Sequence, residues 1–234
     1  MAKHVAKSVL ADAGILTVPG VTLTQATRDQ YSFAELQRRL GATLFVKPAA
    51  SGSSIGVTQV SEADAYSSAI TEAFRYDNHV LVEQSVVGRE IECSVLGNIE
   101  PSTALPGEII VNEKFYDYSA KYLDAQAALV KTPAELTAEL SDKVRSLAQQ
   151  VFTVLQCKGL ARVDFFLTEI GEIFVNEVNT LPGFTDISMY AKNWQVSGVS
   201  QQELFEKLIE LALSDHAKKK ELMRSFLGVA ETQG

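Results

Sequence analysis

The sequence contains little cysteine, no long apolar run and no excess of positive charge. Cys93 and Cys157 are its only cysteines, so we expect no disulfide framework and a reducing, cytoplasmic location. Cysteine–histidine spacing of the zinc-binding kind is absent. No apolar run approaches the length of about 20 residues that a membrane helix needs, so no membrane partner is expected. The net charge of −8 argues against nucleic acid as a partner.

The composition and the hydrophobic pattern indicate a globular chain of strands and helices. Hydrophobic residues make up 46% of the 234 positions, enough for one large domain or two lobes. Strand and helix patterns alternate, but hairpins recur, which predicts an α+β fold with mixed or antiparallel sheets. Helices are predicted at 3–13, 32–40, 61–74, 132–155 and 201–213, and strands at 43–47, 57–60, 80–83, 90–96 and 108–111.

Start signals accompany three of these helices. Ser32 with Glu35 forms a capping box, Ser61 is a candidate N-cap, and Thr132 with Glu135 forms a second box with a proline at the first helical position. The residues from 216 onward, including a run of three lysines, are predicted to be a polar, solvated tail.

The segment 159–185 predicts a β-hairpin with a polar face. Arg162 and Asp164 are two residues apart, as are Glu177 and Asn179, and residues two apart in a strand point the same way. Folding about the loop at 168–172 places Asp164 roughly opposite Glu177.

Two readings of this face remain open. Facing carboxylates repel each other, and a cation between them reverses that effect. Asp164, Glu177 and Asn179 form an all-oxygen ligand set of the kind that suits Mg²⁺ held together with phosphates. The alternative is a solvated polar face on an ordinary hairpin.

The loop at 51–56, Ser-Gly-Ser-Ser-Ile-Gly, has the chemistry of a phosphate-binding flap. Its glycines allow close backbone approach, its amides and hydroxyls are donors, and Lys47 lies just before it. It is not a Walker A loop, since it leads into a strand and lacks the Gly-Lys-Ser/Thr ending. A plain glycine–serine turn is the alternative.

Motifs in a fixed order give the chain a resemblance to a known family. From about Lys3 to Leu213 the sequence resembles D-alanine–D-alanine ligases. The resemblance rests on Lys3, Phe-Val-Lys-Pro at 45–48, Gly-Ser-Ser-Ile-Gly at 52–56, Val-Glu-Gln at 82–84, Gly-Arg-Glu at 88–90, the aromatic segment 115–122, Gly-Leu-Ala-Arg-Val-Asp at 159–164, Asn-Glu-Val-Asn-Thr-Leu-Pro-Gly-Phe-Thr at 176–185 and Ile-Ser-Met-Tyr at 187–190.

The resemblance implies the ATP-grasp fold, in which two lobes hold ATP between them. We expect a small lobe with the phosphate flap at 1–85 and a C-terminal lobe with the metal and substrate site at 86–215, before the tail at 216–234. It also implies a further N-terminal domain that helps to bind the first D-alanine and to form a homodimer. We therefore expect this chain to be the ATP-binding part and its activity alone to be doubtful.

Roles carry over residue by residue from the resemblance. ATP contacts are implied for Lys3, Lys47, the flap residues Ser53 and Ser54, the backbone at Glu83, Gln84 and Val86, the ribose ligand Glu90, and Lys121. Asp164, Glu177 and Asn179 are implied to bind two Mg²⁺ or Mn²⁺ ions. Catalytic or substrate-binding roles are implied for Arg162, Ser53, Lys121, Tyr122, Gly183, Ser188 and Met189, with Tyr122 at the second D-alanine site.

The implied reaction is ATP-dependent formation of D-alanyl-D-alanine for peptidoglycan synthesis, through an acyl phosphate. Two alternatives stay open. The chain could be another ATP-grasp ligase that joins a carboxylate to an amine, or a nucleotide-binding module without turnover.

Overall fold

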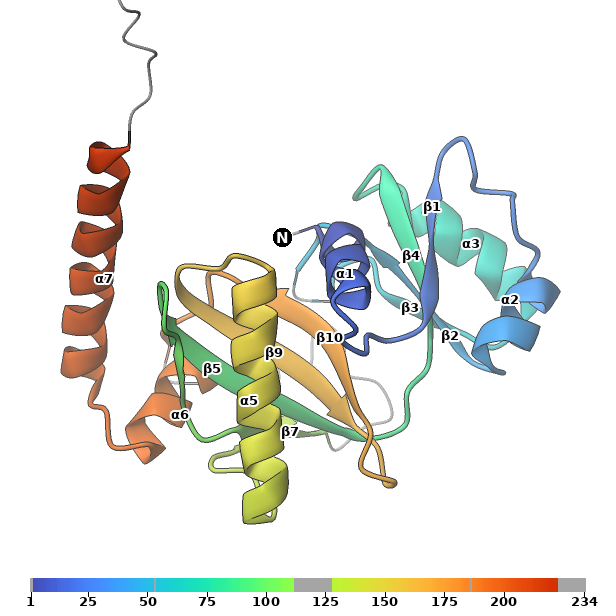
Figure 1. Ribbon diagram of the computed structural model, residues 1–234. Helices are drawn as coiled ribbons and strands as arrows, with labels where there is room; N and C mark the ends of the chain where they lie inside the picture. The colour runs from blue at the N-terminus through green and yellow to red at the C-terminus, as the bar shows by residue number, and fades with distance from the viewer. Residues whose placement is uncertain (1, 53, 112–127, 186, 223–234) are drawn as a thin grey trace, which may run out of the picture.

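The computed structural model describes residues 2–52, 54–111, 128–185 and 187–222. They form two lobes, each built on one antiparallel sheet (Figure 1). This arrangement confirms the prediction of an α+β fold with antiparallel sheets. None of the helices in the described ranges combines the length and the apolar content that crossing a membrane requires.

The smaller lobe has a four-stranded sheet in the order β1 (Gly20–Thr24), β4 (His79–Gln84), β2 (Leu44–Pro48) and β3 (Thr58–Val60). Two helices, α2 (Phe33–Leu40) and α3 (Ala63–Ala73), contribute to its core. Apolar side chains of the helices pack on inward-facing strand residues, which is how an amphipathic helix stabilises one face of a sheet. The buried residues of this core are Leu23, Leu36, Leu40, Leu44, Val46, Val60, Tyr66, Ala69, Ile70, Ala73, Val80 and Val82.

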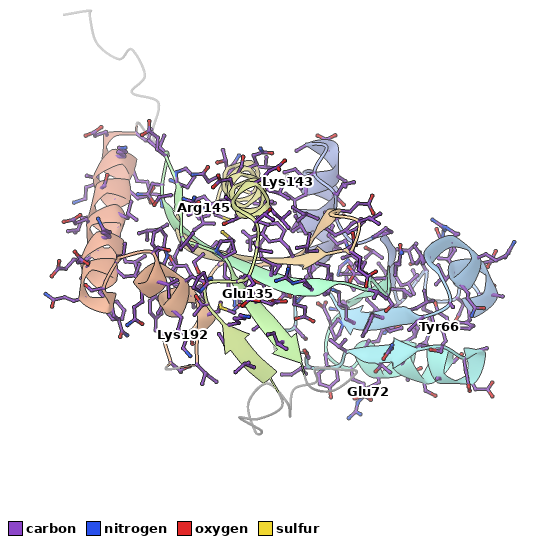
Figure 2. The ribbon with its side chains drawn as sticks, turned by 90° about the horizontal axis from the view of Figure 1, so that it is seen from below. Tyr66, Glu72, Glu135, Lys143, Arg145 and Lys192 are labelled. Atoms are coloured by element: carbon purple, nitrogen blue, oxygen red, sulfur yellow. The ribbon has the colours of Figure 1, made fainter. Side chains whose placement is uncertain are left out.

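The larger lobe has a six-stranded sheet. Its main path runs β10 (Ile173–Asn179), β9 (Gly159–Leu167), β5 (Arg89–Gly97), β7 (Gly107–Val111) and β8 (Ala128–Lys131), and the short β6 (Ser102–Thr103) pairs with β5. Helix α5 (Ala138–Val154) packs on one face, and side chains fill the space between it and the sheet (Figure 2). Helix α6 (Met189–Val196) packs on the other face, followed by α7 (Gln201–Glu221).

Alternation along β5 separates these two faces. Ile91 and Cys93 are fully buried in the core beneath α5. Glu92 and Ser94 point the other way, where Asn193 of α6 donates to the Glu92 carbonyl at 3.0 Å and to the Ser94 hydroxyl at 3.3 Å. Glu92 and Ser94 of β5 thus lie on the α6 face.

Helix α1 (Lys3–Asp12) lies between the two sheets (Figure 1). Leu10 and Ile15 belong to the core of the larger lobe, and the Val175 N–H donates to the Leu16 carbonyl at 2.9 Å. The chain at α1 therefore covers the edge strand β10, which would otherwise expose unpaired backbone groups. The Lys3 N–H in turn donates to the Ala49 carbonyl of the smaller lobe at 2.9 Å.

Several element boundaries differ from the prediction. Helix α5 begins at Ala138 with Thr137 as its cap, not at the predicted box at Thr132. The carboxylate of Glu135 instead pairs with Lys131 at 2.6 Å. Helix α3 begins after Glu62, which makes no side-chain cap, so the prediction of Ser61 as N-cap is wrong.

The last helix extends beyond its predicted end. It continues to Glu221, so the predicted end at Leu213 is wrong, and residues 216–221 are helical. Its capping box at Ser200 and Glu203, and the predicted box at Ser32 and Glu35, are both present. Strands β1, β6 and β8 and helix α6 were not predicted.

Candidate functional site

The hairpin β9–β10 places its polar residues as predicted. Asp164 pairs with Glu177, and Arg162 with Asn179, across the antiparallel register. A β-bulge between Val175 and Glu177 makes Asn176 an extra residue on β10. The bulge reverses the alternation, so Val175 and Val178 both reach the core although they are three residues apart. Glu177 and Asn179 consequently share a face with Asp164.

Arg162 pairs with two buried carboxylates on this face. Its guanidinium contacts both oxygens of Asp164, at 2.7 and 2.8 Å, and Oε2 of Glu92 at 3.0 Å. Burial alone would lower the pKa of Arg162, but Asp164 and Glu92 raise it above its ordinary value. Arg162 is therefore a fixed cation at the centre of the face.

Two lysines reach the same region from the neighbouring elements. Lys3 Nζ lies 3.2 Å from Oε2 of Glu177 and donates to the Ser51 carbonyl of the loop before β3 at 2.5 Å. Lys47 Nζ, at the end of β2, donates to Oδ1 of the bulge residue Asn176 at 3.4 Å. These contacts bring the lysines and carboxylates of the two lobes together.

Glu83 is buried between Lys47 and a lysine that sequence reasoning missed. Its side chain is 3% exposed; Oε2 lies 2.5 Å from Lys47 Nζ, and Oε1 contacts Lys7 Nζ. Burial raises the pKa of Glu83, but the two lysines outweigh it and the net pKa is lowered. The only sequence signal for Lys7 is its position four residues after Lys3, which puts both on one face of α1.

The segment after β10 brings Gly183 and Ser188 together. The Thr185 N–H donates to Ser188 Oγ at 3.0 Å, and a side chain at Gly183 would meet the same oxygen at 3.1 Å. Met189 is buried at the start of α6, against Gly107 of β7. Ser188 and Gly183 can therefore act on one ligand, whereas Met189 is held in packing.

Of the remaining predicted site residues, four lie in the described part of the chain and three do not. Gln84 closes β4, and its N–H donates to the Pro19 carbonyl at 2.9 Å. Val86 is half-buried in the connector to β5, and Glu90 is on β5 opposite Phe166. Ser54, with a φ of +58°, belongs to the loop before β3. Ser53, Lys121 and Tyr122 lie outside the described residues.

The oxygen set on the hairpin fits a hard divalent cation. Asp164 and Glu177 offer carboxylates on facing strands, and Asn179 Oδ1, which accepts from the Leu181 N–H at 3.1 Å, has a second lone pair. Within the described part of the chain, no three His, Cys, Asp or Glu side chains gather as a metal-binding group. The third ligand would therefore be the amide.

The fold and the comparisons define the class of protein. Two antiparallel lobes, with lysines of one facing carboxylates of the other, have the ATP-grasp fold of their structural neighbours. The family described as "D-ala D-ala ligase C-terminus" matches residues 9–210. The chain belongs to this family.

Individual relatives agree with this assignment. D-alanine–D-alanine ligase A of Salmonella typhimurium is 51% identical over 216 residues, which cover 92% of this chain and 59% of the relative. The structure of the D-alanine–D-alanine ligase from Coxiella burnetii matches with a TM-score of 0.85 at 38% identity, over 96% of this chain and 60% of that one. VanG D-Ala:D-Ser ligase from Enterococcus faecalis matches with a TM-score of 0.81 at 36% identity, over 90% and 61%. The chain thus spans about three fifths of the length of its relatives.

Proposed function

We propose that this chain is the ATP-binding part of an enzyme that joins two D-alanine molecules to D-alanyl-D-alanine at the expense of ATP. The observation that carries the proposal is the meeting of Lys3 and Lys47 with Glu177 and Asn176 where the lobes face each other. A triphosphate with a divalent cation is complementary to such a set, since lysines take the phosphates and carboxylates take the metal.

The phosphates would lie between Lys47, Lys3 and the loop at 51–56. Lys3 already contacts the Ser51 carbonyl, so one side chain connects this loop to the carboxylate of Glu177. The adenine would lie along the end of β4 at Glu83, Gln84 and Val86, with the ribose near Glu90. Closure of the loop would exclude water from the reacting phosphate.

Asp164, Glu177 and Asn179 would hold two Mg²⁺ or Mn²⁺ ions, which when bound neutralise charge on the transferred phosphate and orient it. The pairing of Asp164 with Glu177 supports this assignment, because register partners on facing strands can both offer a carboxylate oxygen to one cation. Arg162 holds Asp164 in place through two hydrogen bonds.

The reaction would proceed in two steps. A carboxylate oxygen of the first D-alanine attacks the γ-phosphorus, the bond to ADP breaks, and an acyl phosphate forms. The amine of the second D-alanine then attacks the acyl carbon, phosphate leaves, and the amine loses a proton. Arg162 and the Gly183 backbone would stabilise the oxyanion of this second step. Ser188 would help to position the substrate. Met189, Lys121 and Tyr122 are assigned to the substrate, the phosphate and the acceptor by resemblance alone.

The wider setting is also part of the proposal. The product would serve peptidoglycan synthesis in the cytoplasm, and the complete enzyme would be a homodimer. The division into lobes at 1–85 and 86–215 falls in the connector between β4 and β5. D-Serine is the competing acceptor to test, because one structural neighbour is a D-Ala:D-Ser ligase.

Titration of the chain with ATP and Mg²⁺, followed by assays for phosphate and dipeptide, tests the proposal. We expect saturable, Mg²⁺-dependent ATP binding by the chain itself, and D-alanyl-D-alanine, detected by mass spectrometry, once the N-terminal domain that the resemblance implies is supplied. D-Serine and other small amino acids serve as competing acceptors, and a preference for one of them would favour a different carboxylate–amine ligase. ATP binding without phosphate release would favour a nucleotide-binding module, and absence of ATP binding would contradict both readings.

A further inference from the structure

We propose that Lys7 is a positioning residue that keeps Lys47 available to the triphosphate by holding the carboxylate of Glu83. This inference rests on the proposed function, in which Lys47 contacts phosphate. The resemblance assigned no role to Lys7, and the proposed reaction does not otherwise use it.

The three side chains form a buried cluster with one carboxylate and two ammonium groups. Each lysine takes a different oxygen of Glu83: Lys7 contacts Oε1, and Lys47 lies 2.5 Å from Oε2. The side chains of Lys7, Glu83 and Lys47 are only 14%, 3% and 11% exposed. Water therefore screens these charges weakly, and each contact has a large effect on its neighbour.

The charge of the cluster decides what Lys47 can do. One lysine is enough to neutralise Glu83, so the second leaves the cluster with a net charge of +1. Without Lys7, both oxygens of Glu83 would be left to Lys47, and the ammonium would be neutralised and held within the smaller lobe. With Lys7 in place, Lys47 shares only one oxygen, and a second donor points across to Asn176 at 3.4 Å. An anionic ligand can then compete for it.

The surrounding backbone fixes the cluster. Gly20 of β1 lies so close that a Cβ there would meet Glu83 Cγ at 2.9 Å and the Val82 carbonyl at 2.7 Å. Lys7 is carried by α1, which is anchored through Leu10 in the core of the larger lobe. Glu83 thus has little room to move, and the ammonium of Lys7 meets it from a separately anchored element.

The test compares ATP with adenosine, which lacks the phosphates. Lys7→Met removes the charge and keeps most of the side-chain length. We expect it to weaken Mg²⁺–ATP binding by about tenfold or more, the effect of impairing one charge-assisted hydrogen bond, and to leave adenosine binding unchanged. Lys7→Arg should restore the ATP affinity. Lys143→Met on the exposed surface of α5 is the matched control and should bind both ligands as wild type does (Figure 2).

A second variant separates positioning from folding. In the Lys7→Met/Glu83→Gln double variant no carboxylate at position 83 retains Lys47, so the ATP affinity should recover at least in part. The double variant also provides the test if Lys7→Met alone does not fold. The positioning role is overturned if Lys7→Met binds ATP as tightly as wild type does, or if it loses ATP and adenosine binding equally. It is also overturned if the double variant binds ATP no better than Lys7→Met. When Lys7→Met does not fold, a double variant with a tenth of the wild-type ATP affinity or less overturns the role. If the wild-type chain binds no ATP, the proposed function itself fails and this inference falls with it.

Discussion

Asp164 and Glu177 are register partners on antiparallel strands, so two carboxylates face each other on one side of the larger sheet. Like charges in that position destabilise a sheet. Arg162 offsets the charge of Asp164, and Lys3 offsets that of Glu177. The two cations come from different elements, and only the strand pairing brings the carboxylates together.

Asp164→Asn tests the metal assignment. The substitution keeps the size of the side chain and removes its charge, while Arg162 retains its contact with Glu92. We expect the Mg²⁺ affinity of the ATP complex to fall by about tenfold or more. Asp142→Asn is the control, because Asp142 is 74% exposed on α5. Mg²⁺ titrations that cannot distinguish Asp164→Asn from wild type would rule out Asp164 as a ligand.

The pH dependence of stability tests the ion pairs of Glu83. The pKa of Glu83 is lowered from 4.5 in the folded state, so the unfolded state binds more protons when the pH falls below that value. The contribution of Glu83 to the free energy of unfolding is therefore complete above pH 4.5 and is lost as the pH falls through the folded-state pKa. Urea denaturation at a series of acidic pH values measures this loss. Glu83→Gln should show a shallower decline, and an identical slope in both proteins would contradict the argument.

Two isoleucines test the core of the larger lobe. Ile91 is fully buried on β5, whereas Ile99 is 72% exposed. Ile91→Ala should lower the free energy of unfolding by about 2–5 kcal/mol, since it removes buried methyl groups and leaves a cavity. Ile99→Ala should change it by no more than about 0.5 kcal/mol. Chemical denaturation of the two variants gives the comparison, and equal effects would mean that the core is placed wrongly.

Hydrogen exchange tests the phosphate-binding role of the loop before β3. Lys3 contacts the Ser51 carbonyl, so a bound triphosphate near Lys3 should restrict this loop. We expect peptides covering residues 49–57 to exchange more slowly with a non-hydrolysable ATP analogue and Mg²⁺. Peptides from α5 serve as the control. Equal exchange with and without the analogue would leave the loop as an ordinary turn.

The sequence predicted the hairpin and its polar face correctly because the determinants are local. Residues two apart in a strand share a face, and Gly171 in the loop has a φ of +82°, a conformation that favours glycine. The box at Ser32 and Glu35 formed for the same reason, since both groups lie within one turn of helix. These features depend on neighbours in the chain.

The false capping box at Thr132 shows where local signals fail. The Ala134 N–H donates to the Pro106 carbonyl at 2.7 Å, and Arg89 donates to the Glu135 carbonyl at 3.0 Å. These long-range bonds, with the Lys131–Glu135 pair, hold the segment outside the helix, which then begins at Ala138 with Thr137 as its cap. Tertiary contacts outweighed a local signal of comparable strength.

The sequence by itself determined the kinds of groups at the site and the faces on which the strands present them. Only the tertiary structure decided which cations meet the carboxylates. Lys7 and Lys47 are 76 and 36 positions away from Glu83, and no periodicity relates such residues. Lys47 meets Glu83 because β2 pairs with β4, and Lys7 meets it because α1 lies beside these strands. A carboxylate buried in this way needs cationic partners.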